Sequence, residues 1–341
     1  MQGPAFTSQS GGRICAIAAN PALDRVAVAP GAAAGGTVRA ITFADTAGGK
    51  AVHAAAAAAA LGADVEVVAA LGGSRGALVS ALLRERGIAC YDVPIESETR
   101  GTYTLIDPLA GDVVEVIEPS PTLSAHEAAS LEVAVASAVA GAGVVLASGS
   151  LPSGVDPAFY AMVVDQARRA GALSLIDAHG VALGHALAAG PDLVKPNLSE
   201  ALSLIGQGAD AELATEELLA AARHLRDLGA RMVWLTLGDR GSLLLDESGS
   251  AWRLTLDPPR LVSAVGCGDA LLGGLAAGLA RGLALLDAAR LGVAAAADKL
   301  GRAHPGLVES EGVIALLPRV VVESLSAADP RVLHANHKEE P

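Results

Sequence analysis

The most informative stretch of the sequence is SAVGCGDA at residues 263–270, which is followed by leucines at helical spacing. Gly266 and Gly268 lie just before this predicted helix, where glycine lets backbone N–H groups approach a ligand closely. The unpaired N–H groups and the dipole at a helix start suit an anion. Asp269 places a carboxylate in the first turn, where it can accept a proton from an attacking hydroxyl. The alternative is an ordinary glycine-containing helix start with Asp269 as a first-turn acid, and spacing alone leaves both open.

Around this stretch, short β-rich runs alternate with helical segments along the chain. This alternation predicts βαβ units with right-handed crossovers, and therefore a mostly parallel sheet covered by helices on both faces. The predicted strands are 14–19, 65–70, 144–147, 173–176, 193–194 and 232–237. The predicted helices are 50–61, 76–86, 125–140, 157–169, 181–188 and 212–228.

Two segments, 26–43 and 90–117, break this alternation because they carry β-type residues with no helix between them. The second predicts a hairpin around residues 109–112. Together they predict a small antiparallel sheet that acts as a lid over a reaction site, and the open edge of such a lid predicts a homodimer. We expect one domain over 13–322, with the lid at about 24–45 and 90–118, between a flexible tail at 1–12 and a second tail at 323–341.

Composition excludes several classes of protein. The 341 residues carry a net charge of −13, which predicts no binding surface for nucleic acid or for an anionic membrane. Aromatic residues make up only 2%, so the core must be built from Ala, Val and Leu. Three widely spaced cysteines predict neither a disulfide framework nor a zinc site, and favour a reducing cytoplasm. The uncharged stretch 133–155 contains the helix-breaking run GSLPSG, and residues 1–12 do not resemble a signal peptide.

Four further clusters are candidates for ligand binding, and three of them also have a purely structural interpretation. NPALD at 20–24 ends the first strand, where open α/β sheets bind ligands, or forms a turn. GGK at 48–50 puts a lysine at a helix start, which is unfavourable unless an anion is near. KPNLSE at 195–200 also fits a helix cap, and GDRG at 238–241 also fits a hairpin turn. The glycine-lysine phosphate loop and the dinucleotide glycine fingerprint are both absent from the sequence.

In their order and spacing these clusters resemble the PfkB (ribokinase-like) carbohydrate kinases over residues 14–301, and look most like the branch of 1-phosphofructokinase and tagatose-6-phosphate kinase. The resemblance implies a ribokinase-like three-layer α/β/α fold with a mostly parallel central sheet and a small antiparallel β lid. It rests on NPALD at 20–24, AGGK at 47–50, LGG at 71–73, ETR at 98–100, SGSLPSGV at 148–155, DAHG at 177–180, KPNLSE at 195–200, TLG at 236–238 and VGCGDA at 265–270.

The resemblance also implies roles for individual residues. Asp269 matches the catalytic base, and the anion hole that stabilises the transferring phosphoryl group corresponds to Gly266, Cys267 and Gly268. Asn197 and Glu200 match the element that organises Mg²⁺, partly through water, around the phosphates of ATP. The remaining positions match substrate-binding residues (Asp24, Gly48, Gly49, Lys50, His53 and Arg100) and nucleotide-binding residues (Lys195, Asn197, Thr236, Gly238 and Gly241). Lys50 and Arg100 are expected to hold the phosphate that the substrate already carries.

Three departures from the branch lie in the sugar half of the site. Residues 51–53 read AVH where the branch usually has Gly-Ile-Asn, so His53 replaces an amide. Thr102 stands where a second amide is common, and a usual Thr-Glu pair of the lid reads Val114-Glu115. A histidine can still donate to a phosphate, so these changes predict altered sugar recognition with an intact phosphoryl-transfer half.

The sequence therefore predicts a kinase that uses ATP and Mg²⁺ to phosphorylate a ketohexose phosphate. The expected reaction converts fructose 1-phosphate to fructose 1,6-bisphosphate, or tagatose 6-phosphate to its bisphosphate. One alternative is a kinase of the same family acting on an unphosphorylated sugar or nucleoside, and another is a sugar-phosphate binder without catalysis. A nicotinamide-dependent oxidoreductase is less consistent with the sequence because its glycine fingerprint is missing.

Overall fold

The first strand, β1 (Arg13–Ala18), shows why the chain builds a sheet that is covered on both faces. In the computed structural model, which describes residues 12–32, 36–204, 206 and 213–325, all but the first residue of β1 are buried. Ile14 and Ala16 pack into one hydrophobic core, whereas Cys15 and Ile17 pack into a second core on the opposite face. A strand that is apolar on both faces is typical of a parallel sheet between helical layers.

The large sheet has ten described strands in the order β14-β13-β12-β11-β10-β9-β8-β1-β4-β5. Pairing is parallel from β5 to β11 and antiparallel from β11 to β14, so the predicted mostly parallel sheet is confirmed. Besides β1, its strands are β4 (Val65–Leu71), β5 (Ala89–Pro94), β8 (Ala142–Ser148), β9 (Leu173–Asp177), β10 (Leu193–Val194), β11 (Met232–Thr236), β12 (Ser242–Leu245), β13 (Ala251–Thr255) and β14 (Val321–Ser324).

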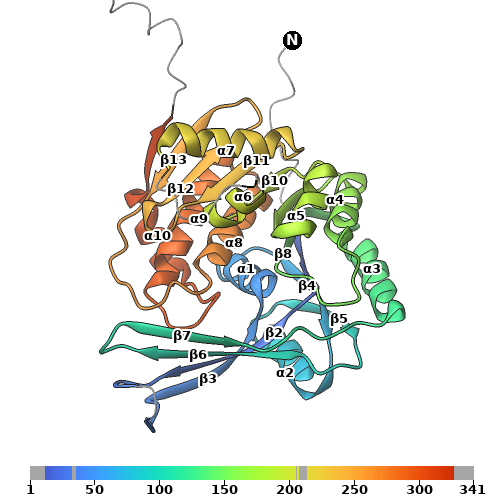
Figure 1. The fold of residues 1–341 in the computed structure, drawn as a ribbon, viewed down its shortest axis with the longest axis vertical. Helices are drawn as coiled ribbons and strands as arrows, with labels where there is room; N and C mark the ends of the chain where they lie inside the picture. Colours follow the sequence, from blue (N-terminus) through green and yellow to red (C-terminus); the bar gives the residue numbers. More distant parts are fainter. Residues whose placement is uncertain (1–11, 33–35, 205, 207–212, 326–341) are drawn as a thin grey trace, which may run out of the picture.

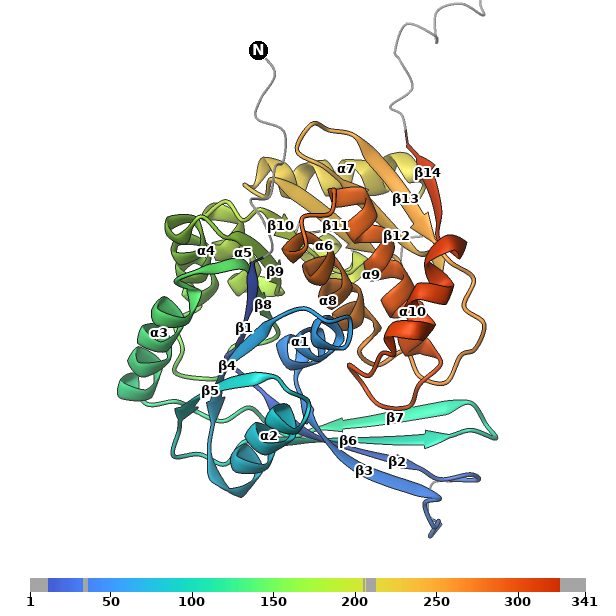
Figure 2. The ribbon, with the colours of Figure 1, turned by 180° about the vertical axis from the view of Figure 1, so that it is seen from behind.

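Helices cover both faces of this sheet, which gives the expected three-layer α/β/α architecture (Figures 1 and 2). One layer holds α1 (Lys50–Ala60), α2 (Gly73–Glu85), α8 (Cys267–Ala280), α9 (Leu285–Leu300) and α10 (Ser310–Leu316). The other holds α3 (Ala125–Val139), α4 (Phe159–Ala170), α5 (Gly180–Ala188), α6 (Leu198–Leu204) and α7 (Thr215–Asp227). Two 3-10 turns complete the described elements, η1 (Gly238–Arg240) and η2 (Leu317–Arg319).

A second, four-stranded sheet projects from one end of the large sheet (Figure 2). Its order is β3-β2-β6-β7, with strands β2 (Ala22–Val28), β3 (Thr42–Gly48), β6 (Arg100–Asp107) and β7 (Asp112–Ile117). The two outer pairs are antiparallel as predicted, but the central pair β2 and β6 is parallel. The hairpin of β6 and β7 turns at the predicted residues. Strand β5 was expected in this sheet and instead pairs in parallel with β4 of the large sheet.

The predicted boundaries differ from the structure at a few ends. Helix α2 begins at Gly73, earlier than the expected 76, and β14 extends to Ser324, beyond the expected domain end at 322. The expected tails lie outside the described residues except for their inner ends. In the described part of the chain, every helix is too short or too polar to span a bilayer.

Helix α8 packs against its neighbours through small residues that bring the backbones together. A methyl carbon at Gly273 would meet the carbonyl oxygen of Ala54 in α1 at under 3.0 Å. Methyl carbons at Gly274 and Gly278 would lie 2.7 Å from Cα atoms of α9. We call this contact of α8 with α1 and α9 the small-residue seam. It holds the start of α1 close to the start of α8.

Candidate active site

A cavity of about 480 Å³ opens where the parallel strands end, between the large sheet and the small sheet. Such a position is where open α/β sheets bind ligands. The large sheet and its helices contribute Asn20, Gly49, Lys50, His53, Gly149, Ser150, Asp177, His179, Lys195, Asn197, Glu200, Thr236, Val265, Gly266, Gly268 and Asp269. The small sheet contributes Asp24, Arg100, Thr102, Glu115 and Ile117.

Most of the predicted site residues therefore meet at one place, and four do not line the cavity. Gly48 stands directly behind the Asp24 carboxylate. Cys267 directs its thiol toward the carbonyl of Ser263, at 3.8 Å. Gly238 and Gly241 flank the turn between β11 and β12, so the cavity reaches only Thr236 of the predicted nucleotide segment.

The start of α8 places a carboxylate beside unpaired backbone donors. Gly266 adopts φ 81°, a left-handed conformation that glycine reaches without strain, and it turns the chain into the helix. The first N–H that donates within the helix is that of Ala270, to the Gly266 carbonyl. The N–H groups of Gly268 and Asp269 precede it and have no acceptor one turn back in the helix. This geometry suits an anion, and Asp269 is buried next to it with 7% of its surface exposed.

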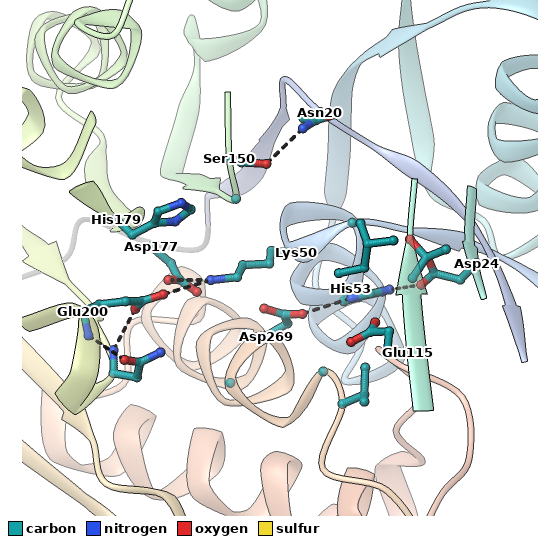
Figure 3. Close-up of a pocket in the computed structure, with 18 of the residues that line it drawn as sticks. Asn20, Asp24, Lys50, His53, Glu115, Ser150, Asp177, His179, Glu200 and Asp269 are labelled. Carbon is teal, nitrogen blue, oxygen red and sulfur yellow. Dashed lines mark hydrogen bonds and ion pairs between the residues drawn. The ribbon is translucent and has the colours of Figure 1, made fainter. Parts of the chain in front are cut away.

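His53 lies between Asp269 and a second buried carboxylate, Asp24 (Figure 3). Its Nδ1 is 3.0 Å from Asp269 Oδ2, and its Nε2 is 2.6 Å from Asp24 Oδ2. Burial favours the neutral imidazole, but the charges and hydrogen bonds of the two carboxylates outweigh it and raise the pKa of His53 to about 10. Both ring nitrogens are therefore hydrogen-bonded to protein carboxylates, and neither is left to donate to a substrate phosphate.

A second group of charges lies on the other side of Asp269. Lys50, the first residue of α1, holds its ammonium 3.6 Å from both Asp177 and Glu200. Lys195 lies 3.0 Å from Asp177, which is 1% exposed. Burial acts to raise the pKa of Asp177, but the two lysines lower it below its usual value. The pKa of Lys50 is raised by its carboxylate neighbours despite burial.

The residues matched to Mg²⁺ form a reciprocal cap at the start of α6. The N–H of Glu200 donates to Asn197 Oδ1, at 2.8 Å, and the N–H of Asn197 donates to Glu200 Oε2, at 2.9 Å. Among the described residues, no group of three or more His, Cys, Asp or Glu side chains could hold a metal by itself. One or two carboxylates at a cavity wall still fit Mg²⁺, which keeps most of its water and binds substrate phosphates.

The small sheet supplies the opposite wall. Arg100 donates through Nη2 to the carbonyl of Asn20, at 3.2 Å, and burial lowers the pKa of its guanidinium. Glu115 faces the same cavity, where burial first and the charge of Asp24 second raise the pKa of its carboxyl group. Thr102, which was noted as a departure, and Glu115, the retained acid of the lid pair, thus both line the site.

Several lining residues were not among the predicted ones. Asp177 was quoted as part of DAHG and Asn20 as part of NPALD, but neither was given a role. Both lie at or just after the carboxyl end of a buried parallel strand, and this position is the signal that could have identified them. The same holds for Gly149, Ser150 and His179, whereas Ile117 and Val265 carry no such signal.

Comparisons with known proteins find a family model, curated relatives and solved structures that this chain is similar to. The family model described as pfkB family carbohydrate kinase matches residues 14–307. The 1-phosphofructokinase of Rhodobacter capsulatus is 32% identical over 92% of this chain and 98% of its own length. The ATP-dependent 6-phosphofructokinase isozyme 2 of Mycobacterium tuberculosis (strain ATCC 25618 / H37Rv) is 37% identical over 67% of this chain and 66% of its own length. A solved structure of phosphofructokinase-2 from Escherichia coli with substrates and products superposes with a TM-score of 0.81, at 26% identity over 90% of this chain and 98% of that one.

Proposed function

The chain belongs to the pfkB family of carbohydrate kinases and is thus a phosphotransferase enzyme, and we propose that it transfers the γ-phosphoryl group of ATP to a ketohexose phosphate. The proposed acceptor is fructose 1-phosphate, which becomes fructose 1,6-bisphosphate. One observation carries the proposal: the buried Asp269 carboxylate lies beside the N–H groups at the start of α8, in a cavity that also holds Lys50 and Arg100.

In the proposed reaction the acceptor hydroxyl attacks the γ-phosphorus. The new O–P bond forms as the bond from phosphorus to the bridging oxygen breaks, which releases ADP, and the hydroxyl proton passes to Asp269. His53 occupies Oδ2 of Asp269, so Oδ1 is the atom proposed to take the proton. Because the transition state is loose, the proton moves late, and positioning and charge stabilisation supply most of the acceleration.

The phosphoryl group in transfer is proposed to lie over the start of α8, against the N–H groups of Gly268 and Asp269. Lys195 lies beside this place, because its Nζ would be 3.4 Å from a methyl carbon at Gly268. Lys50 is paired with the same carboxylate, Asp177. Asn197 and Glu200 would hold Mg²⁺ through water. Held there, the ion would supply positive charge beside the phosphates of ATP.

The phosphate that the substrate already carries is assigned to Arg100 first. Lys50 was expected to share this task, but its ammonium is already paired with two carboxylates. The hydrogen bond from Arg100 to Asn20 uses one Nη2–H, and the buried Nε of Arg100 has no hydrogen-bond partner among the described residues. We call the wall of the cavity that the small sheet supplies, with Asp24, Arg100, Thr102, Glu115 and Ile117, the sugar wall. A guanidinium with donors to spare at this wall suits a phosphate.

A second acceptor, a hexose 6-phosphate, is supported by the names of the relatives. The Mycobacterium tuberculosis relative is a 6-phosphofructokinase isozyme, and a Staphylococcus epidermidis relative at 26% identity is named tagatose-6-phosphate kinase. The position of Arg100 does not distinguish the two ends of the sugar.

The test is a coupled assay of ADP release with Mg-ATP and a panel of acceptors. The panel contains fructose 1-phosphate, fructose 6-phosphate, tagatose 6-phosphate, the free sugars and ribonucleosides. Turnover highest with fructose 1-phosphate supports the proposal, and turnover only with unphosphorylated acceptors overturns the acceptor while leaving the chemistry. Asp269→Asn should lower kcat by about 10²–10⁴-fold with ATP affinity unchanged, and near-normal turnover would contradict its role as base.

We also propose that the small sheet pairs with a second copy of the chain. Residues Ile41, Phe43, Val114 and Val116 are each at least 55% exposed. The strand register places Phe43, Val114 and Val116 on the face of the small sheet opposite to Asp24, where an exposed apolar patch suits a partner. Light scattering coupled to size exclusion measures the mass. Phe43→Lys with Val116→Lys should give a monomer, and a wild-type monomer at micromolar concentration would contradict the proposal.

A further inference from the structure

His53 joins two carboxylates that come from opposite walls of the cavity (Figure 3). Asp24 belongs to β2 of the small sheet, and Asp269 belongs to the first turn of α8. The imidazole spans the space between them with both nitrogens within hydrogen-bond distance, at 2.6 Å and 3.0 Å. The sugar wall and the base are therefore connected through a single ring.

Only the doubly protonated ring can donate a hydrogen bond to both carboxylates. A neutral imidazole has one N–H and one lone pair, so it would donate to one carboxylate and direct its lone pair at the other. The charged groups around the ring are Asp24 on β2, Asp269 on α8, Glu115 on β7, Arg100 on β6 and Lys50 on its own helix. The two contacting carboxylates dominate this set, and the pKa of His53 is accordingly raised.

Glycines with no room for a side chain hold the connected groups in place. A methyl carbon at Gly306 would lie 2.8 Å from His53 Cα and 3.2 Å from its Cδ2, so the backbone of this loop lies against the ring. A methyl carbon at Gly48 would meet all three atoms of the Asp24 carboxylate at under 3.0 Å. Neither the ring nor the Asp24 carboxylate can move toward these backbones.

We propose that His53 is a positioning residue, an imidazolium that holds the sugar-wall carboxylate Asp24 and the base Asp269 in one fixed relation. The inference rests on the proposed kinase function, and it replaces the expectation that His53 binds the substrate. Each carboxylate accepts a hydrogen bond from His53 through Oδ2, which leaves its Oδ1 for the sugar. Oδ1 of Asp269 would then meet the reacting hydroxyl, and Oδ1 of Asp24 a second hydroxyl. A change at Asp24 thus alters kcat through His53 as well as substrate affinity.

The kinetic test compares His53→Asn and His53→Ala with the matched control His185→Asn, which changes an exposed histidine of α5. Loss of a charge-assisted hydrogen bond to the base should lower kcat about 10- to 100-fold. The acid limb of the kcat/KM profile should move to higher pH, because two buried carboxylates without a cation between them hold a proton more tightly. Imidazole should restore part of the His53→Ala activity, whereas pyrazole, a neutral ring of the same size, should not.

A double-mutant cycle adds Asp24→Asn. If His53 transmits the effect of Asp24, this substitution lowers kcat in the wild-type background and no longer does so in the His53→Asn background. A rise in KM alone, with kcat and the acid limb as in wild type, would show an ordinary substrate ligand and overturn the proposal.

A spectroscopic readout separates this inference from the proposed function. In the full chain labelled with ¹⁵N-histidine, the signal of His53 is the one missing from His53→Asn. We expect both of its nitrogens to carry protons at pH 8 in the absence of substrate, and the ring to lose a proton at lower pH in Asp24→Asn. A singly protonated ring at pH 8 in the wild type would overturn the inference. A doubly protonated ring in a chain that turns over no acceptor of the panel would overturn the proposed function alone.

Discussion

Gly48→Ala is the most direct test of how the backbone holds the sugar wall. Gly48 ends β3 and pairs with Ala22 at the start of β2. A methyl group there would meet the Asp24 carboxylate at under 3.0 Å, a distance that real Cβ atoms essentially never show. Gly48 is not one of the described glycines with a positive φ. Alanine there therefore brings no backbone strain and acts only through this collision. The Asp24 side chain must turn away from His53.

The expected loss can be worked from the contact that is broken. The 2.6 Å hydrogen bond from His53 Nε2 to Asp24 Oδ2 is charge-assisted in the proposed imidazolium form. Such a bond contributes about 1.5–3 kcal/mol, and 1.4 kcal/mol corresponds to a factor of ten. We therefore expect kcat/KM for the sugar phosphate to fall about 10- to 150-fold, with ATP affinity unchanged because Asn197 and Thr236 lie across the cavity.

Steady-state kinetics with the accepted sugar phosphate and calorimetric titration of nucleotide measure these two quantities. Gly184→Ala is the matched control, because Gly184 also lacks a positive φ and a methyl group there would find only an ordinary contact at 4.0 Å with Leu204. It lies inside α5, where alanine stabilises by up to about 1 kcal/mol. Wild-type kcat/KM in Gly48→Ala would refute the argument that this glycine sets the position of Asp24.

Three further predictions concern buried charges and thiols. Lys195→Met removes the 3.0 Å partner of the buried Asp177 and leaves Lys50 at 3.6 Å, so urea unfolding should show a loss of about 3 kcal/mol, and unchanged stability would contradict the pairing. Because the pKa of His53 is raised to about 10, its contribution to stability is complete below about pH 6.5 and is lost toward pH 10. Between these pH values, the free energy of unfolding of the wild type should fall more steeply than that of His53→Asn, by up to about 1.4 kcal/mol per pH unit. Equal slopes of the two proteins in urea unfolding would argue against this prediction. Burial raises the pKa of Cys267 to about 11 and that of Cys15 to about 12, so alkylation at pH 8 should be slow before unfolding, and Cys267→Ala should keep kcat/KM within about threefold of wild type.

The alternation of strands and helices could be predicted because each element satisfies its own local pattern. Strand partners could not, because periodicity shows which face of a strand is buried and not which strand lies beside it. For this reason β5 was expected in the small sheet, although Cys90 pairs with Val67 of the large sheet. For the same reason the parallel pairing of β2 with β6 was not expected.

The candidate site was predictable where a motif carries its chemistry in consecutive residues, as at Gly266–Asp269 and Asn197–Glu200. It was not predictable where the chemistry arises between distant residues. His53 and Asp269 are 216 positions apart, and only folding shows that the histidine meets carboxylates on both sides. Asp177 has the same origin, because its lysine partners come from α1 and from the segment after β10.

The small-residue seam also determines which parts of this enzyme can change. Lys50 and His53 on α1 and Asp269 on α8 are carried by helices whose backbones touch, so the two helices cannot slide past each other without losing that contact. In the proposed kinase, any opening that admits the sugar then falls to the strands of the small sheet. Gly273, Gly274 and Gly278 do not line the cavity, yet a methyl group at any of them would press apart the helices that carry the proposed catalytic residues. For the proposed kinase we therefore expect new sugar preferences to arise from substitutions in β2, β6 and β7, while the packing of the paired helices stays unchanged.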